Sequence, residues 1–334
     1  MIQNLPQKPA YIVPPKTDAV PRRPRMPRPA PASAAERKYR IALQQMVDIY
    51  AKMALATIIP VYEKLQAERS DGLLHHDLDP TKQITTAMLI AFRKAGNDYP
   101  LWALRKMIGE NFLLTERVQF GNWNLQARSA GIGDIRRFTP RLAQKAAEYE
   151  ARNVALIKSI PNGLHDDLRS VISGEFGKGT HVRDLSKILQ DRFSVTRSRA
   201  DLIATDQTLT LQGQLDELRQ KDAGVTSYLW RTSNDSRVRG TPGGLYPRAR
   251  FSHYEREGIK FYWNDPPEDG HPKEAIRCRC WPEPVFDDLD MEQAEFLPTG
   301  VREPSYGGFL GEAVAQGSLI SSLLSIGVRD LTTM

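Results

Sequence analysis

The stretch RSRADLIATDQTLTLQGQ at residues 197–214 lies within a predicted helix of about residues 196–221. Five residues in it, at offsets of 0, 4, 7, 11 and 14, share one helical face: Arg199, Ile203, Asp206, Thr210 and Gly213. A glycine inside a helix costs about 1 kcal/mol relative to alanine, so Gly213 predicts that a neighbouring backbone approaches this face closely. The alternative is a solvated face on which Arg199 and Asp206, two turns apart, form a weak ion pair.

Downstream of this helix, four candidate metal ligands gather in one stretch. Both cysteines of the chain, Cys278 and Cys280, follow closely behind His271, and His253 precedes them. Thiolates and imidazoles at short spacing are typical of tetrahedral zinc, and a structural site uses four such ligands. The stretch therefore predicts a structural Zn²⁺ on these four residues, with Asp235 as a replacement ligand or as a hydrogen-bond acceptor behind them. The alternative is a pair of buried thiols beside histidines that satisfy loop hydrogen bonds.

Cysteine usage and hydropathy indicate the cellular compartment in which the protein is expected. Two cysteines separated by one residue are badly placed to form a disulfide with each other, which favours a reducing environment. No run reaches 18 apolar residues, and the N-terminal MIQNLPQKPA lacks the apolar core of a secretion signal. We therefore expect a protein made and assembled in the cytoplasm, without a membrane partner.

The positive charge of the chain is concentrated at its N-terminus. The net charge is +6, and residues 1–35 contain six basic residues against one acidic residue. Residues 5–33 also hold nine prolines, a composition that favours extended polyproline II over helix. Residues 1–33 are thus predicted to be a disordered leader, or a basic arm that orders on an acidic protein or on DNA phosphates. The arginines predicted to make this DNA or portal contact are Arg22, Arg23, Arg25 and Arg28.

Apolar residues recur at steps of three and four through much of the chain, which predicts a largely helical protein. Besides the helix at 196–221, predicted helices cover about residues 34–65, 81–95, 101–118, 139–158 and 182–189, with a short helix ending near 172. Pro60 is expected to kink or divide the first, and Pro161 to end another. Glycines at 174–179 predict a connector, after which Thr180 is a candidate N-cap. The adjacent His75 and His76 are expected in a loop.

Two aromatic segments, SYLWRT at 227–232 and KFYW at 260–263, are typical of strands. The fold class predicted is therefore α+β, with mostly helical N-terminal and central regions and a small aromatic-rich β/loop module near the C-terminus. We expect a helical docking region at 34–149, a compact domain at 150–286 and a flexible or docking tail at 287–334.

The motifs of residues 150–284 occur in an order that resembles the phage Mu F-like head-morphogenesis family, the minor head proteins of tailed phages. The matching elements are LIKSIP at 156–161, the helix at 197–214, Tyr228–Trp230–Thr232, Asp235–Arg237–Arg239, His253, Gly258, FYWNDPP at 261–267, His271–Pro272 and Cys278–Arg279–Cys280. The structural motif residues carried over by this resemblance are Arg199, Asp206, Trp230, Asp235, Arg237 and Arg239.

Two departures from the family pattern are visible. Members usually pass almost directly from the Asp–x–Arg–x–Arg segment to the histidine, whereas here GTPGGLYPRARFS intervenes at 240–252. Thr205 also stands where many members have an arginine before the position of Asp206.

The resemblance implies a low-copy, non-enzymatic minor capsid protein. Such a protein is incorporated at the portal vertex during procapsid assembly and is located in the virion, with the portal protein and other head proteins as partners. Some members are thought to contact packaged DNA and to affect assembly or DNA delivery. The alternatives are a metal-dependent nuclease or toxin-like enzyme, and a separate DNA-binding role of the N-terminal arm. The chain shows no Ser–His–Asp spacing, phosphate-cradling glycine loop or H-E-x-x-H helix.

Overall fold

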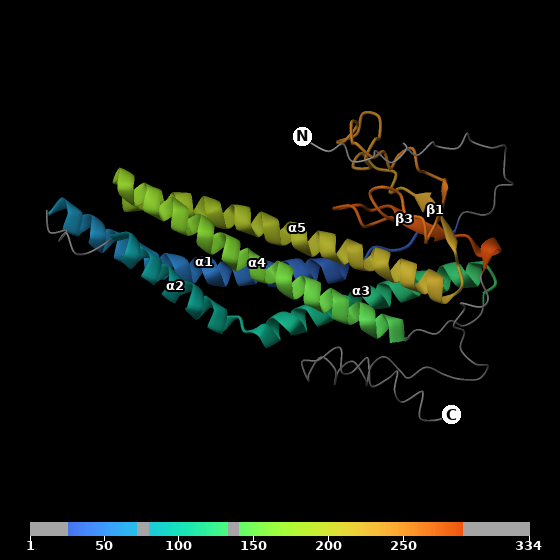
Figure 1. Cartoon of the computed structure of the whole chain (residues 1–334), viewed down its shortest axis with the longest axis horizontal. Helices are drawn as coiled ribbons and strands as arrows, with labels where there is room; N and C mark the ends of the chain where they lie inside the picture. The colour runs from blue at the N-terminus through green and yellow to red at the C-terminus, as the bar shows by residue number, and fades with distance from the viewer. Residues whose placement is uncertain (1–25, 72–79, 133–139, 290–334) are drawn as a thin grey trace, which may run out of the picture.

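The computed structural model describes residues 26–71, 80–132 and 140–289. Long helices run side by side along the longest axis, and a small sheet lies at one end (Figure 1). The helices are α1 (Ser33–Ser70), α2 (Pro80–Asp98), α3 (Leu101–Ser129), α4 (Pro140–Lys178) and α5 (Val182–Asp222). The strands are β1 (Ser227–Arg231), β2 (Lys260–Tyr262) and β3 (Trp281–Pro284), followed by a 3₁₀ turn at Phe286–Asp288. The predicted α+β class is confirmed.

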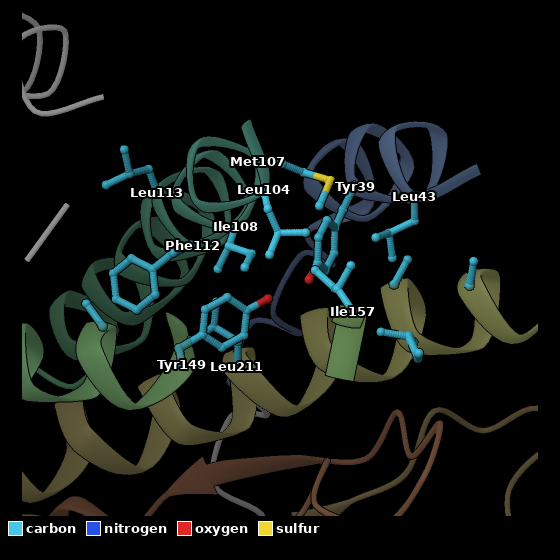
Figure 2. Packing of buried hydrophobic residues seen from close by; sticks show 14 of the residues in the cluster. Tyr39, Leu43, Leu104, Met107, Ile108, Phe112, Leu113, Tyr149, Ile157 and Leu211 are labelled. Atoms are coloured by element: carbon cyan, nitrogen blue, oxygen red, sulfur yellow. The ribbon is translucent and has the colours of Figure 1, made fainter. Parts of the chain in front are cut away.

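The helical region has two buried apolar clusters, which follow each other along the length of the helices. At 38 and 41 residues, α1 and α5 are each about 60 Å long, which is more than one compact core can cover. The first cluster joins α1, α3, α4 and α5, and Figure 2 shows Tyr39, Phe112, Tyr149 and Leu211 converging within it. The second joins α1, α2, α4 and α5. None of the helices in the described part of the chain is long and apolar enough to cross a membrane.

Buried polar side chains cross-link the first cluster. The Tyr39 hydroxyl donates to Asn153 Oδ1 at 2.7 Å, and the Tyr149 hydroxyl donates to Asn111 Oδ1 at 2.6 Å. Asn111 Nδ2 in turn donates to Thr208 Oγ1 at 3.1 Å. Because buried polar groups are costly unless paired, these bonds favour one relative placement of the four helices.

Several predicted helix breaks are wrong. Pro161 lies inside α4, which continues through it, so the helix end predicted there is wrong. Pro60 lies inside α1 and does not divide it. A proline removes one backbone hydrogen bond, but apolar side chains before and after it are buried on the same helical faces, so packing offsets that loss. The expected connector at 174–179 is likewise mostly the end of α4, and the two helices expected between 182 and 221 are the single helix α5. The predicted domain boundary at 149/150 falls inside α4.

The N-cap of α5 also differs from the prediction. His181 occupies that position, and its Nδ1 accepts a hydrogen bond from the Arg183 backbone N–H. Thr180 instead donates through its hydroxyl to Glu175 Oε2. His75 and His76 and residues 290–334 of the predicted tail lie outside the described residues.

The sheet is antiparallel and has the order β2–β1–β3. The strands predicted at 227–232 and 260–263 are confirmed as β1 and β2. The strand β3, of sequence WPEP, was not expected because two of its four residues are prolines. It is an edge strand, where a proline lacking an N–H is tolerated. Its backbone is tied to α5 through a hydrogen bond from Gln220 Nε2 to the Pro282 carbonyl at 3.0 Å.

The predicted close approach at Gly213 is confirmed. A Cβ at this position would lie 2.8 Å from the Pro272 carbonyl oxygen and 2.9 Å from Lys273 Cβ. The predicted alternative is wrong, because Arg199 donates to Ser159 Oγ while Asp206 accepts from the Arg277 backbone N–H. Gly213 is therefore the position at which the loop before β3 rests on α5.

We expect Gly213→Ala to destabilise the protein by about 1–3 kcal/mol, because the new methyl group overlaps backbone that must then move. The matched control is Gly121→Ala in α3, where a Cβ would meet nothing within 4 Å. That change should stabilise by about 1 kcal/mol through helix propensity alone. Urea unfolding of both variants measures the difference. An equal gain in stability at both positions would show that the contact at Gly213 is not tight.

Candidate metal centre

Three of the four predicted ligands come together in the small β module. The candidate donor atoms of His253, Cys278 and Cys280 all lie within 4.8 Å of one another, and all three residues are buried. His253 Nδ1 is 3.4 Å from Cys278 Sγ and 3.5 Å from Cys280 Sγ. A tetrahedral zinc ion with ordinary bond lengths separates sulfur from nitrogen ligands by about 3.6 Å. The group thus has the donor types and the spacing of three corners of a zinc site.

The sheet brings these ligands together from distant parts of the sequence. Pairing of β1 with β3 sets Arg231 opposite Trp281, so Cys280 is held beside the end of β1. A turn in which the Cys278 N–H donates to the Ala275 carbonyl precedes it, with Arg277 at a positive φ of 57°. His253 enters from the loop before β2, and its ring packs edge-on against Trp230 of β1 at 5.0 Å between centroids.

A carboxylate orients the histidine from behind. His253 Nε2 lies 2.8 Å from Asp269 Oδ2, and an ionised carboxylate only accepts, so Nε2 carries the proton and Nδ1 faces the sulfurs. Arg256 donates to the other Asp269 oxygen at 2.6 Å and lies over the Trp230 ring at 4.8 Å. A carboxylate behind a ligating histidine is a recurrent feature of metal sites because it fixes the tautomer and the ring plane.

Charge at the centre is shared among three groups. A hydrogen bond from the Cys280 thiol, assisted by one from His253, holds the pKa of Cys278 well below its usual value. The same coupling, together with burial, raises the pKa of Cys280. Burial opposes protonation of His253, but Asp269 and the Cys278 sulfur outweigh it and raise the histidine pKa. The group therefore stabilises one thiolate next to a cation, and a bound metal ion would replace the shared proton.

His271, the fourth predicted ligand, lies outside this group. Its Nδ1 is 2.8 Å from the Tyr228 hydroxyl, and its ring packs against Trp263 at 4.8 Å between centroids. Burial lowers its pKa, which keeps the imidazole neutral among these aromatic rings. Its position is thus that of a core residue of the sheet.

Asp235 also lies outside the group of three. Its Oδ1 accepts from Arg279 Nη2 at 2.7 Å and from the Arg237 backbone N–H at 2.9 Å. These partners lower its pKa against the opposing effect of burial. The Asp–x–Arg–x–Arg segment is therefore a structural turn, in which Arg239 also donates to the Ile276 carbonyl at 2.9 Å.

Sequence reasoning did not identify the residues that support the centre. Asp269 was only one of several loop carboxylates near His271, and nothing in its spacing distinguished it. Glu257 was another, and its Oε2 accepts from both the N–H and the hydroxyl of Thr232, the residue that follows β1. The DNA or portal contact residues Arg22, Arg23 and Arg25 precede the described residues, whereas Arg28 is described and exposed.

Comparisons with known proteins relate part of this chain to one family. Residues 166–282 match the family described as phage Mu protein F-like. A curated protein of Haemophilus influenzae, itself named uncharacterized, is 32% identical over 156 residues, which are 46% of this chain and 32% of the relative. The chain thus spans about a third of the length of that relative. No solved structure matches the chain significantly. The match over residues 166–282 therefore makes this part of the chain, about a third of its length, similar to the phage Mu protein F-like family.

Proposed function

We propose that the protein is a minor head protein of a tailed bacteriophage, incorporated at the portal vertex during procapsid assembly in the host cytoplasm and retained in the virion. The observation that carries this proposal is the family match over 166–282, which includes all of α5 and nearly all of the module. The family is one of head morphogenesis, so other head proteins are the expected partners, with the portal protein first among them.

The shape of the molecule suits a docking role. Helices α1 to α5 form a rod that carries the module at one end (Figure 1). Helix α5 contacts other helices of the rod and also strand β3 of the module. A partner that binds the long helices would therefore fix the position of the module as well. This arrangement supports a role in assembly in which the helices bind one head protein and the module faces another.

The N-terminal arm is the proposed contact with packaged DNA or with an acidic portal surface. Its last residues are held against α3, where Asn122 accepts from the Ala30 N–H at 2.9 Å and donates to the Ala30 carbonyl at 2.8 Å. Gln126 donates to the Pro27 carbonyl at 3.3 Å. These bonds fix where the arm leaves the body, and the exposed Arg28 lies within the held segment.

Particle composition tests the assembly role. Procapsids and mature virions from an infection should contain the protein in low copy number, and it should co-purify with the portal protein. Quantitative mass spectrometry of gradient-purified particles measures both, with a non-structural phage protein as the contamination control. If the protein appears only in the soluble lysate, the proposal fails.

We propose further that His253, Cys278 and Cys280 supply three of the four ligands of a structural Zn²⁺. The three side chains are at most 5% exposed, which leaves a substrate no direct approach to a metal bound between them. A structural ion would join the loop before β2, which carries His253, to the segment before β3, and its binding would add to the folding free energy. This burial favours a structural role over the metal-dependent nuclease or toxin-like alternative.

Metal analysis tests this site. Protein purified without added metal should contain close to one zinc per chain, and Cys278→Ser should remove it and lower the melting temperature. His271→Asn is the matched control, because it alters a buried histidine outside the group of three and should leave the zinc content unchanged. Absence of metal from the parent protein would leave the two cysteines as packing residues.

A further inference from the structure

A strongly basic loop leads into the metal centre. Residues 236–254, here called the arginine loop, contain four arginines and no aspartate or glutamate. They include the 240–252 segment by which the chain departs from the usual family spacing. The four arginines are Arg237, Arg239, Arg248 and Arg250. The loop therefore carries a local charge of +4 in a chain whose net charge is only +6.

Three of the four arginines of the loop are exposed. The Arg237 side chain is 60% exposed, and Arg248 and Arg250 are exposed as well. Large apolar or aromatic groups lie among them, with Tyr246 55% and Tyr254 49% exposed. These two tyrosine rings are therefore not explained by packing in the core, because about half of each side chain is exposed among the arginines.

Few acidic side chains neutralise the positive charge of the arginine loop. Within the described residues, Arg237 has an ion pair with Asp235 at 3.7 Å, and that carboxylate is held more closely by Arg279 at 2.7 Å. The Arg250 guanidinium lies over the Phe251 ring at 4.9 Å. No described carboxylate lies within ion-pair distance of Arg248 or Arg250. The loop is thus a positive surface without an internal counter-charge.

The loop has a defined internal structure. The Leu245 N–H donates to the Ser236 carbonyl at 2.7 Å, and the Gly240 N–H donates to the Tyr246 carbonyl at 2.9 Å. Gly240 has a φ of +82° and sits so close to the Ser252 side chain that a Cβ would overlap it. These contacts fold the chain back on itself and place Tyr246 beside the segment that carries Arg237 and Arg239.

Both ends of the loop are fixed to the module. At its start Asp235 is bonded to Arg279, and at its end His253 enters the metal centre, while the Tyr254 N–H donates to the Arg239 carbonyl at 3.0 Å. Between them lies a cavity of about 350 Å³ lined by residues of both the motif and the loop, including Asn234, Asp235, Thr241 and Tyr254. The loop extends from the module on the side of α5 away from α3 (Figure 1).

We propose that the arginine loop is a nucleic-acid-binding surface, in which Arg237, Arg248 and Arg250 contact phosphates and Tyr246 stacks on a base. Arginines without counter-charges bind phosphates with release of counterions, and exposed aromatic rings among them offer stacking to any base. An acidic protein surface would satisfy the arginines alone, whereas the exposed tyrosines favour a nucleic acid. This surface is separate from the N-terminal arm and does not depend on the role in head assembly.

Binding of the full chain to a fluorescent 30-nucleotide single strand, and to the duplex of the same sequence, tests the proposal across a range of salt concentrations. Replacing Arg237, Arg248 and Arg250 with alanine should reduce the slope of log affinity against log salt by about 2 to 3, since each phosphate contact contributes about 0.7 to 0.9. Tyr246→Ala should weaken binding to the single strand about tenfold with little change in slope. A larger effect of Tyr246→Ala on the single strand than on the duplex identifies unpaired bases as the preferred ligand.

Matched variants separate the loop from other basic surfaces. Lys52, Lys94 and Arg183 are exposed on the helical rod, and replacing all three with alanine removes the same charge and should leave binding unchanged. Replacing the three loop arginines with lysine should preserve most of the salt slope. Equal melting temperatures and zinc contents across the set would show that the module remains folded.

Two results would overturn the proposal. One is a loop triple-alanine variant that binds as well as the rod variant does. The other is a loss confined to Arg22→Ala, Arg23→Ala and Arg25→Ala in the full chain, which would place all binding on the arm. Neither result bears on particle incorporation, which is measured separately, so failure here leaves the proposed assembly role intact.

Discussion

The contact on which the module depends is the approach of the Pro272–Lys273 backbone to Gly213 of α5. Only a residue without a Cβ leaves room for that carbonyl at the helix surface. Two further bonds fix the same segment, from Lys273 Nζ to Asp216 Oδ2 at 2.7 Å and from Thr210 Oγ1 to the Lys273 carbonyl at 3.4 Å. A sheet of three short strands is too small to be stable without packing against a helix, and α5 supplies that surface.

The last turns of α5 then fix the direction in which the module points. Gln220 donates to the Pro282 carbonyl and accepts from Trp263 Nε1 at 3.1 Å, so one side chain binds both β3 and the segment after β2. One position earlier, the fully buried Arg219 pairs with Glu116 of α3 at 2.9 Å. A buried ion pair adds little net stability, but removing one partner costs about 3–5 kcal/mol, so this pair strongly disfavours other registers of α5 on α3.

Local patterns in the sequence predicted the parts of this arrangement that depend on short-range chemistry. The helical stripes, the two aromatic strands and the requirement for glycine at 213 all follow from side-chain period and backbone geometry. The continuity of α4 through Pro161 could not be predicted, because the packing that offsets the proline comes from other helices. Nor could spacing distinguish His253 from His271, since the Tyr228 hydroxyl that engages His271 is 43 residues away in sequence.

These fixed contacts also explain how the module accommodates the arginine loop. The entropy of closing a loop rises only with the logarithm of its length, so extra residues between two anchored positions cost little once the anchors exist. Here one anchor is the Asp235–Arg279 pair, and the other is His253 held by Asp269 and the two sulfurs. Because residues 240–252 lie outside the sheet and none of them is buried, their sequence is constrained by the turn of the loop and not by the core. Arg248 and Arg250 are therefore not required by the fold, and a ligand for them is the simplest physical reason for their presence.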